Sequence, residues 1–319
     1  MAPARSLLWA FAASSVAWLG CGSSDDGPEP GEERAGGDTT SFSTSQDAYT
    51  QPASTLDPVQ VGTFQVGNIF NGDDWVVAPA STEQRDGLGP VYNATSCSAC
   101  HLRDGRGRPP NPGEDMLSML VRLSIPGEDA HGGPQPEPHY GGQLQPRAIP
   151  GVPAEGIAKV SWSEEPGSYA DGTPYSLRRP TLEITDLAFG PMQDGTLMSA
   201  RIAGAQYGLG LVEAIAEQDV LAHADPNDQN GDGISGRPNY VWDAAHQQTA
   251  LGRLGWKANV PSVLLQTTGA LNGDIGITSP IFPDSNCADG QTACAAAPNG
   301  GTPEIEGTIL DSMVFYGQT

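Results

Sequence analysis

The stretch SCSACHLRDGRGRPP, residues 96–110, places two cysteines three positions apart and a histidine directly after the second. On one helical turn Cys97 and Cys100 share a face, so both thiols can reach the two vinyl groups on one edge of a haem. His101, four positions after Cys97, then directs its imidazole at the iron. Cys-x-x-Cys-His is the attachment signature of a c-type haem. The stretch therefore predicts one covalent haem held by Cys97, Cys100 and His101.

Other readings of the same cysteines are less well supported. A thioredoxin-like redox pair needs a βαβ context, and no such pattern precedes the motif. A tetrahedral zinc site needs four ligands, and the sequence offers no second Cys/His cluster. Two alternatives stay open: a dithiol oxidoreductase that uses Cys97 and Cys100 directly, and a non-catalytic surface lipoprotein. A haem stain on a denaturing gel separates the first alternative from a haem protein.

The first twenty residues predict export. Arg5 supplies a positive charge, and the apolar run LLWAFAASSVAWL (7–19) is too short to span a bilayer but fits a signal-peptide core. The run ends in WLGC (18–21), which resembles a bacterial lipoprotein signal with Trp18 where that pattern prefers Leu. We expect a lipoprotein signal peptide at 1–20 and a lipid-modified Cys21. An ordinary cleaved signal is the alternative.

The next segment has almost nothing to bury. Residues 22–51 consist mostly of Ser, Gly, Asp, Glu, Pro and Thr, a composition that cannot offset its ordering entropy. We expect residues 21–55 to be a disordered tether that holds a domain at 56–319 clear of the membrane. The predicted location is the bacterial cell envelope, facing the periplasm or on the outer membrane.

The charge balance limits the partners. With 15 Lys and Arg against 38 Asp and Glu, the net charge is −23. Phosphates of nucleic acids and anionic lipid headgroups would repel such a chain, so we expect no nucleic-acid partner and membrane contact only through the lipid anchor. The expected partner is a redox protein.

Two further cysteines need a partner in an oxidising compartment. Cys287 and Cys294 are separated by the polar segment ADGQTA. We expect them to form a disulfide that closes this short loop.

Hydrophobic patterning predicts short strands at 116–125, 159–165 and 182–189 and helices at 209–223, 261–272 and 302–316. The 41 glycines and 28 prolines predict long turn-rich connections between them.

Seven stretches resemble, in order, the bacterial di-haem oxidoreductase family of c-type cytochromes, whose members are also described as peroxidases or predicted thiol oxidoreductases. The stretches are DGLGPVYNATSCSACHLRDGRGRPP (86–110), YGGQLQPRAIPGVPAEG (140–156), YADGTPYSLRRP (169–180), SARIAGAQYGLGLVEAI (199–215), NGDGISGRPNYVWD (230–243), LGRLGWKAN (251–259) and NGDIGITSPIFP (272–283). The resemblance as a whole covers the chain from about residue 60 to the end. The resemblance implies electron transfer or peroxide reduction. It also implies a mainly α fold with short β segments and long irregular loops, a cytochrome c-like haem domain with a large loop-rich insertion.

The family carries two Cys-x-x-Cys-His motifs, the second beyond a helix that matches 303–316. This sequence contains one motif. We therefore expect one haem and no second haem domain.

The second axial ligand and the propionate partners are not singled out by spacing. The candidate axial ligands are Met116, Met119, Met192, Met198, His131, His139, His223 and His246. Candidate partners for the haem propionates are Arg103, Arg106 and Arg108.

The segment ADPNDQNGDGISGRPN (224–239) resembles the first half of a calcium loop. Asp228, Asn230 and Asp232 alternate before Gly233, and the carbonyl of Ile234 would be a backbone ligand. Position twelve of the loop is Asn239 instead of Glu, and such sequences also form turns without metal. Calcium is therefore a possible second cofactor, in keeping with related peroxidases that hold calcium near their haems.

Overall fold

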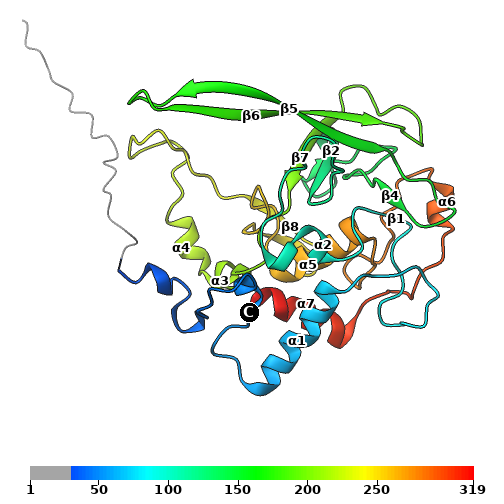
Figure 1. Ribbon diagram of the computed structural model, residues 1–319, viewed down its shortest axis with the longest axis horizontal. Helices are drawn as coiled ribbons and strands as arrows, with labels where there is room; N and C mark the ends of the chain where they lie inside the picture. The colour runs from blue at the N-terminus through cyan, green and yellow to red at the C-terminus, as the bar shows by residue number, and fades with distance from the viewer. Residues whose placement is uncertain (1–29) are drawn as a thin grey trace, which may run out of the picture.

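The computed structural model describes residues 30–319 (Figure 1), so the signal peptide predicted at 1–20 and Cys21 lie outside the described residues. The α-helices are α1 (Pro58–Gly72), α2 (Cys97–Cys100), α3 (Leu209–Ala214), α4 (Glu217–Leu221), α5 (Val263–Ala270), α6 (Thr292–Ala295) and α7 (Gly307–Gln318). The strands are β1 (Val91–Tyr92), β2 (Met119–Glu128), β3 (Pro134–Gln135), β4 (Arg147–Ala148), β5 (Ile157–Ser168), β6 (Pro174–Thr185), β7 (Leu197–Ile202), β8 (Tyr240–Asp243) and β9 (Gln248–Leu251). Within the described range, no helix is long and apolar enough to cross a membrane.

A helical layer forms one side of the molecule. In Figure 1, α1, α7 and α5 lie below α2, and the strands lie above it. The first hydrophobic core fills this layer: Phe70, Trp75, Leu88, Ile149, Leu271, Ile275, Ile277, Ile305, Leu310 and Met313. Cys97 packs against this core, so one end of the haem-attachment helix α2 is anchored on it.

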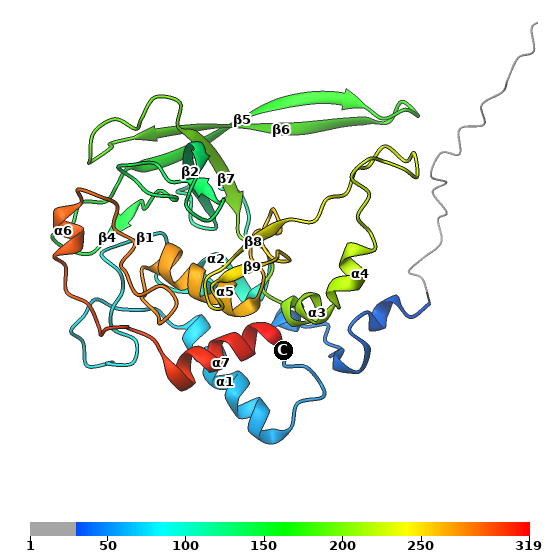
Figure 2. The same cartoon turned by 180° about the vertical axis from the view of Figure 1, so that it is seen from behind.

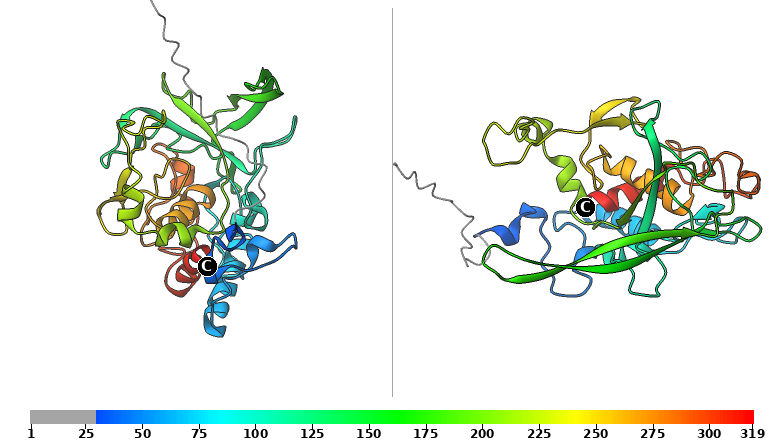
Figure 3. Two further views of the ribbon diagram at one scale, coloured as in Figure 1. Left: turned by 90° about the vertical axis from the view of Figure 1, so that its left-hand side faces the viewer. Right: turned by 90° about the horizontal axis from the view of Figure 1, so that it is seen from above.

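A second layer is built from small antiparallel sheets. β2 pairs with β3 on one side and with β7 on the other, and β5 pairs with β6 along twelve residues each. The view from behind shows the β5–β6 hairpin across the top of the molecule, and the view from above shows that it follows one long edge (Figures 2 and 3). The second core lies under its base: Met116, Met119, Val121, Leu123, Tyr140 and Leu144.

Local sequence signals explain α1. The Asp57 side chain accepts hydrogen bonds from the backbone N–H groups of Val59 and Gln60, and the Gln60 side chain accepts one from the Asp57 N–H. This reciprocal cap, with Pro58 at the first helical position, satisfies donors that a helix start leaves free. The apolar face that follows packs on α7, whose Tyr316 hydroxyl donates to the Asp104 carboxylate at 2.5 Å in the loop after the haem motif.

The prediction of a mainly α, cytochrome c-like fold is wrong. Of the residues that the structure describes, 24% are helical and 22% are in strands, and the strands form several small sheets. Alternating side chains put Met119, Val121 and Leu123 on one buried face of β2, which is a strand pattern. Glycine and proline interrupt the helical patterns, so most helices have fewer than nine residues.

Two predicted helices differ from those observed. The pattern at 209–223 breaks at Ile215, whose backbone is extended, and gives the separate helices α3 and α4. The helix expected from Thr302 begins at Gly307 instead, after Glu306, whose backbone is extended and whose side chain makes no capping hydrogen bond.

Residues 30–55 are the described part of the segment predicted to be a disordered tether. They form three short 3₁₀ helices, Glu32–Arg34, Gly37–Thr39 and Ala48–Thr50. They also contact the domain: Tyr49 stacks on Tyr207 with ring centroids 4.1 Å apart, and the Ala53 N–H donates to the Thr319 carbonyl. These contacts join residues 30–55 to the domain, and the disordered tether at 21–55 stays a prediction.

The close packing of α1 against α7 depends on Gly67. A Cβ at this position would lie 2.1 Å from the Ser312 carbonyl oxygen and 2.6 Å from the Tyr316 Cβ. Gly67→Ala should therefore lower the free energy of unfolding by about 2 kcal/mol or more, as overpacking typically does. The matched control is Gly62→Ala on the same helix, where a Cβ has nothing within 4 Å. It should be neutral or stabilise by about 0.5–1 kcal/mol. Urea unfolding measures both, and equal effects at the two positions would contradict this packing.

Candidate functional site

The haem motif forms a single helical turn with an oriented histidine. Cys97–Cys100 is α2, and the His101 N–H donates to the Cys97 carbonyl at 2.9 Å. The His101 Nδ1 lies 2.7 Å from the Gly204 carbonyl oxygen. A carbonyl only accepts, so Nδ1 carries the proton and Nε2 keeps its lone pair free for a metal. A hydrogen bond of this kind fixes the ring orientation of metal-ligating histidines.

The two thiols of the motif are free and are not bonded to each other. Burial raises the pKa of Cys97 to about 12 and that of Cys100 to about 11, with the nearby Asp274 carboxylate adding to both shifts. Both are therefore thiols at neutral pH. The Cys100 thiol donates to the Leu117 carbonyl, with 3.0 Å between Sγ and oxygen.

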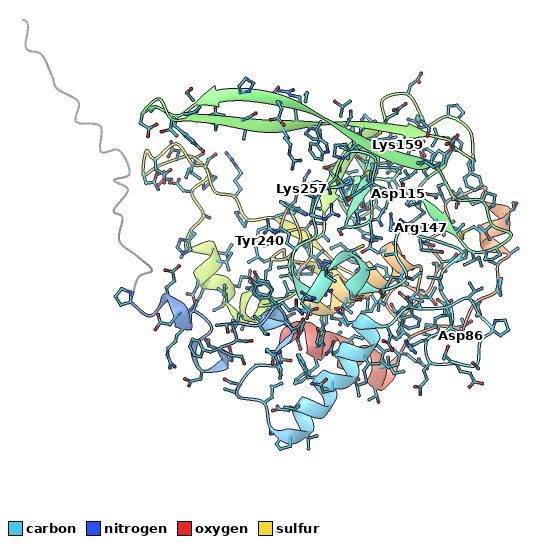
Figure 4. The ribbon with its side chains drawn as sticks, viewed as in Figure 1. Asp86, Asp115, Arg147, Lys159, Tyr240 and Lys257 are labelled. Carbon is cyan, nitrogen blue, oxygen red and sulfur yellow. A yellow bond between two sulfur atoms is a disulfide. The ribbon has the colours of Figure 1, made fainter. Side chains whose placement is uncertain are left out.

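A cavity of about 250 Å³ lies between the second core and the loop that carries β4. Its walls are mostly apolar: Asn93, Asp115, Met116, Met119, Leu120, Val121, Leu144, Pro146, Arg147, Ile157 and Ala158. Figure 4 shows Asp115 and Arg147, which line the same cavity, beneath the base of the β5–β6 hairpin. The positive charge of Arg147 also lowers the pKa of Cys100, although burial raises that pKa by more. No residue of α2 lines the cavity, which is linked to the motif through Arg147 and through Leu117, the neighbour of Met116 whose carbonyl accepts from the Cys100 thiol.

A layer of buried amides backs this cavity. The Gln143 Nε2 lies within hydrogen-bond distance of the Asn93 Oδ1 (2.6 Å), the Gly273 carbonyl (2.9 Å) and the Asp274 Oδ1 (2.7 Å). Gln145 donates to the same Gly273 carbonyl at 2.7 Å. These bonds fix the Asp274 segment beside the motif, where Asp274 contributes to the pKa values of both cysteines.

Glu155 is a buried acid behind the same wall. It is 1% exposed and accepts hydrogen bonds from the Gln145 N–H and the Gln291 Nε2, each at 2.6 Å. Burial raises its pKa to about 7 against the opposing effect of these bonds. Gln291 belongs to the loop closed by a disulfide between Cys287 and Cys294, whose Cα atoms are 5.8 Å apart. The disulfide loop thus helps to hold the wall of the cavity.

Two of the eight candidate axial ligands line the cavity, Met116 and Met119, and both are buried. The other six lie elsewhere. Met198 is exposed on β7, His131 stacks on Trp242 and His246 pairs with Asp243 at 2.8 Å. Met192, His139 and His223 are also absent from the cavity lining.

The three arginines suggested for the propionates are engaged away from the cavity. Arg103 pairs with Asp47 at 3.2 Å, Arg108 pairs with Glu114 at 2.7 Å, and Arg106 lies over the Trp256 ring. The cation of the cavity is Arg147, which the sequence analysis missed. It lies within a stretch quoted for the family resemblance, but no spacing joins it to a motif 46 positions earlier.

The predicted calcium ligands lie together in one exposed turn, with much of their hydrogen-bonding capacity used inside it. The Asp228 carboxylate accepts from the Gly233 N–H, and Asp232 accepts from the Ile234 N–H and the Asn230 side chain. Across residues 30–319, no group of three or more His, Cys, Asp or Glu side chains is arranged to hold a metal ion. Calcium at this loop stays a prediction.

Comparison with known proteins identifies a family. The model of the family described as "Di-haem oxidoreductase, putative peroxidase" matches residues 31–319. No curated protein and no solved structure matches the chain.

The raised pKa of Glu155 predicts a pH-dependent stability. Between about pH 4.5, where the unfolded carboxyl loses its proton, and about pH 7, the folded state binds the extra proton. Stability therefore falls as the pH rises through this window, by about 3 kcal/mol in total. In Glu155→Gln the free energy of unfolding should no longer show this fall of about 3 kcal/mol. Urea unfolding at about pH 5 and about pH 8 measures it.

Glu183→Gln, at an exposed site on β6, is the matched control and should follow the wild type. Parallel pH profiles for the wild type and Glu155→Gln would show that Glu155 is ionised throughout the range.

Proposed function

The chain belongs to the di-haem oxidoreductase family, and we propose that Cys97, Cys100 and His101 hold one covalent c-type haem that serves electron transfer or peroxide reduction. Membership of the family implies haem as the cofactor. The covalent attachment, the single haem and the role of each residue are our proposal.

One observation carries it. The imidazole of His101 is fixed by the Gly204 carbonyl through Nδ1, which leaves Nε2 for the iron, directly after two free thiols on one helical turn. A mostly apolar cavity is lined by one cationic side chain, Arg147, whose charge acts on Cys100 of this turn. The donor set and its surroundings therefore fit a haem.

The side chains around the cavity have separate roles. The bound haem would supply one-electron transfer and, where its iron has an open position, the reduction of peroxide. Arg147 would balance the charge of the propionates, and the carbonyl of Gly204 would hold the proton on His101 Nδ1. The apolar side chains of Leu144 and Val121 exclude water from the site.

The dithiol alternative has less support. A catalytic dithiol needs one thiolate at neutral pH, which positive surroundings or a helix N-terminus provide. Here burial and Asp274 raise both thiol pKa values instead. Thioether formation would consume both sulfurs.

We further propose an exported, lipid-anchored protein of the bacterial cell envelope, on the basis of the apolar run at 7–19 and the WLGC sequence ending at Cys21. A soluble or membrane redox protein is the proposed partner. Calcium at 228–234 would be an additional structural ion.

The haem assignment predicts a double-variant result. Protein matured with haem-ligation machinery should show one haem per chain on a denaturing gel stained for haem, and Cys97→Ala with Cys100→Ala should lose all of it. The matched control removes the disulfide cysteines, Cys287→Ala with Cys294→Ala, and should keep the stain. Haem that survives denaturation in the first double variant would refute covalent attachment at this motif.

The cavity predicts the distal ligand. Met116→Ala or Met119→Ala should abolish a sulfur-to-iron charge-transfer band in the oxidised spectrum and lower the reduction potential, since a thioether ligand raises it. Met198→Ala, at an exposed position on β7, is the control and should leave the spectrum unchanged. An unchanged spectrum in both cavity variants would show that neither methionine binds the iron.

A further inference from the structure

The His101 ligand is connected by hydrogen bonds to one exposed aromatic side chain. The Trp256 indole N–H donates to the Ile202 carbonyl at 2.8 Å, and two residues later in the same segment the Gly204 carbonyl accepts from His101. Two hydrogen bonds and the backbone of 202–204 therefore link the Trp256 ring to the imidazole. Trp256 is 58% exposed.

The connecting segment is held on both sides. The Ala203 N–H donates to the Ser118 carbonyl at 2.9 Å, and the Ala203 carbonyl accepts from the Gly107 N–H at 3.0 Å. Ile202 also pairs with Met119 across the β2–β7 ladder. The segment is fixed by β2 and by the loop after the haem motif, so the link has one geometry.

Two cationic residues adjoin Trp256, in contrast with the acidic chain as a whole. The Arg106 guanidinium lies 5.8 Å from the centre of the Trp256 ring, and Lys257 is the next residue in the chain. Among the residues that the structure describes, neither Arg106 nor Lys257 forms an ion pair with a carboxylate. Lys257 does not line the cavity, and Figure 4 shows it to the left of Asp115, below the β5–β6 hairpin.

We infer that Trp256 is the surface end of the electron path to His101, and that its partner is a one-electron carrier with an acidic docking face. The inference rests on the proposed haem. Bonds and hydrogen bonds couple an electron donor to its acceptor better than empty space does, and the indole offers a large π-system at the surface. Arg106 and Lys257 attract an acidic partner and orient it over the ring.

The step is a single electron transfer. The carrier loses one electron, and the ferric iron bound through His101 gains it and becomes ferrous. No covalent bond forms or breaks, and no proton moves.

The test compares Trp256→Phe with Trp162→Phe in the haem-loaded protein. Trp162 is a matched control because an arginine, Arg178, also lies over its ring, 5.0 Å from the centre, while its indole N–H has no hydrogen-bond partner. The probe is a reduced plant-type ferredoxin, an acidic one-electron donor of low potential. Trp256→Phe should lower its second-order rate of haem reduction about ten-fold, while Trp162→Phe leaves it within about two-fold.

Two further measurements separate the path from general damage. The absorption spectrum, the reduction potential and the rate of reduction by dithionite should be the same in both variants and the wild type. Binding of oxidised ferredoxin, measured by calorimetry at low salt, should weaken about ten-fold in Lys257→Glu and should weaken with rising salt in the wild type.

Each contrary result has a defined meaning. If ferredoxin reduced the haem of Trp256→Phe at the wild-type rate, the electron path would be overturned. If the affinity for ferredoxin changed neither with salt nor in Lys257→Glu, the acidic partner would be overturned. A purified protein without haem would overturn the proposed function, and this inference with it.

Discussion

The hydrogen bond between His101 Nδ1 and the Gly204 carbonyl is the contact on which the site depends. It joins a motif near residue 100 to a segment about one hundred positions later in the chain. Without it the imidazole could rotate and either nitrogen could carry the proton. With it, the backbone at 202–204 determines the orientation of the His101 imidazole. The same segment also accepts a hydrogen bond from Gly107, in the loop after the motif, and one from the exposed Trp256 indole.

The cavity combines an apolar front with a polar back. Leu144 and Pro146 face the cavity, while Gln145 between them points into the amide layer and meets Glu155 and Gly273. Charges near the motif are few and of both signs, since Arg147 and Asp274 both influence Cys100. Where water is scarce the effective dielectric constant is low, so each of these charges would interact more strongly with a bound redox group.

The Cys-x-x-Cys-His motif could be predicted from the sequence, but the residues that reach it from distant parts of the chain could not. Cys97, Cys100 and His101 lie within five positions, so one turn of helix determines their relation. Arg147, Gly204 and Asp274 reach the site through pairings that depend on how β1, β4 and β7 close, which no periodicity reveals. The fold class was predicted wrongly because it came from the family resemblance, while β2 and the long β5–β6 hairpin carry a clear strand alternation. Contacts such as Tyr49 on Tyr207, which join residues 30–55 to the domain, have no signal in the composition either.

The division of the interior into two hydrophobic cores has a consequence for folding cooperativity. α2 is anchored on the helical core through Cys97, whereas Met116 and Met119 of the second core line the cavity beside it. A group bonded to the first core and packed against the second would bridge them. Such a bridge would couple the two cores, so loading with haem would make their unfolding more cooperative.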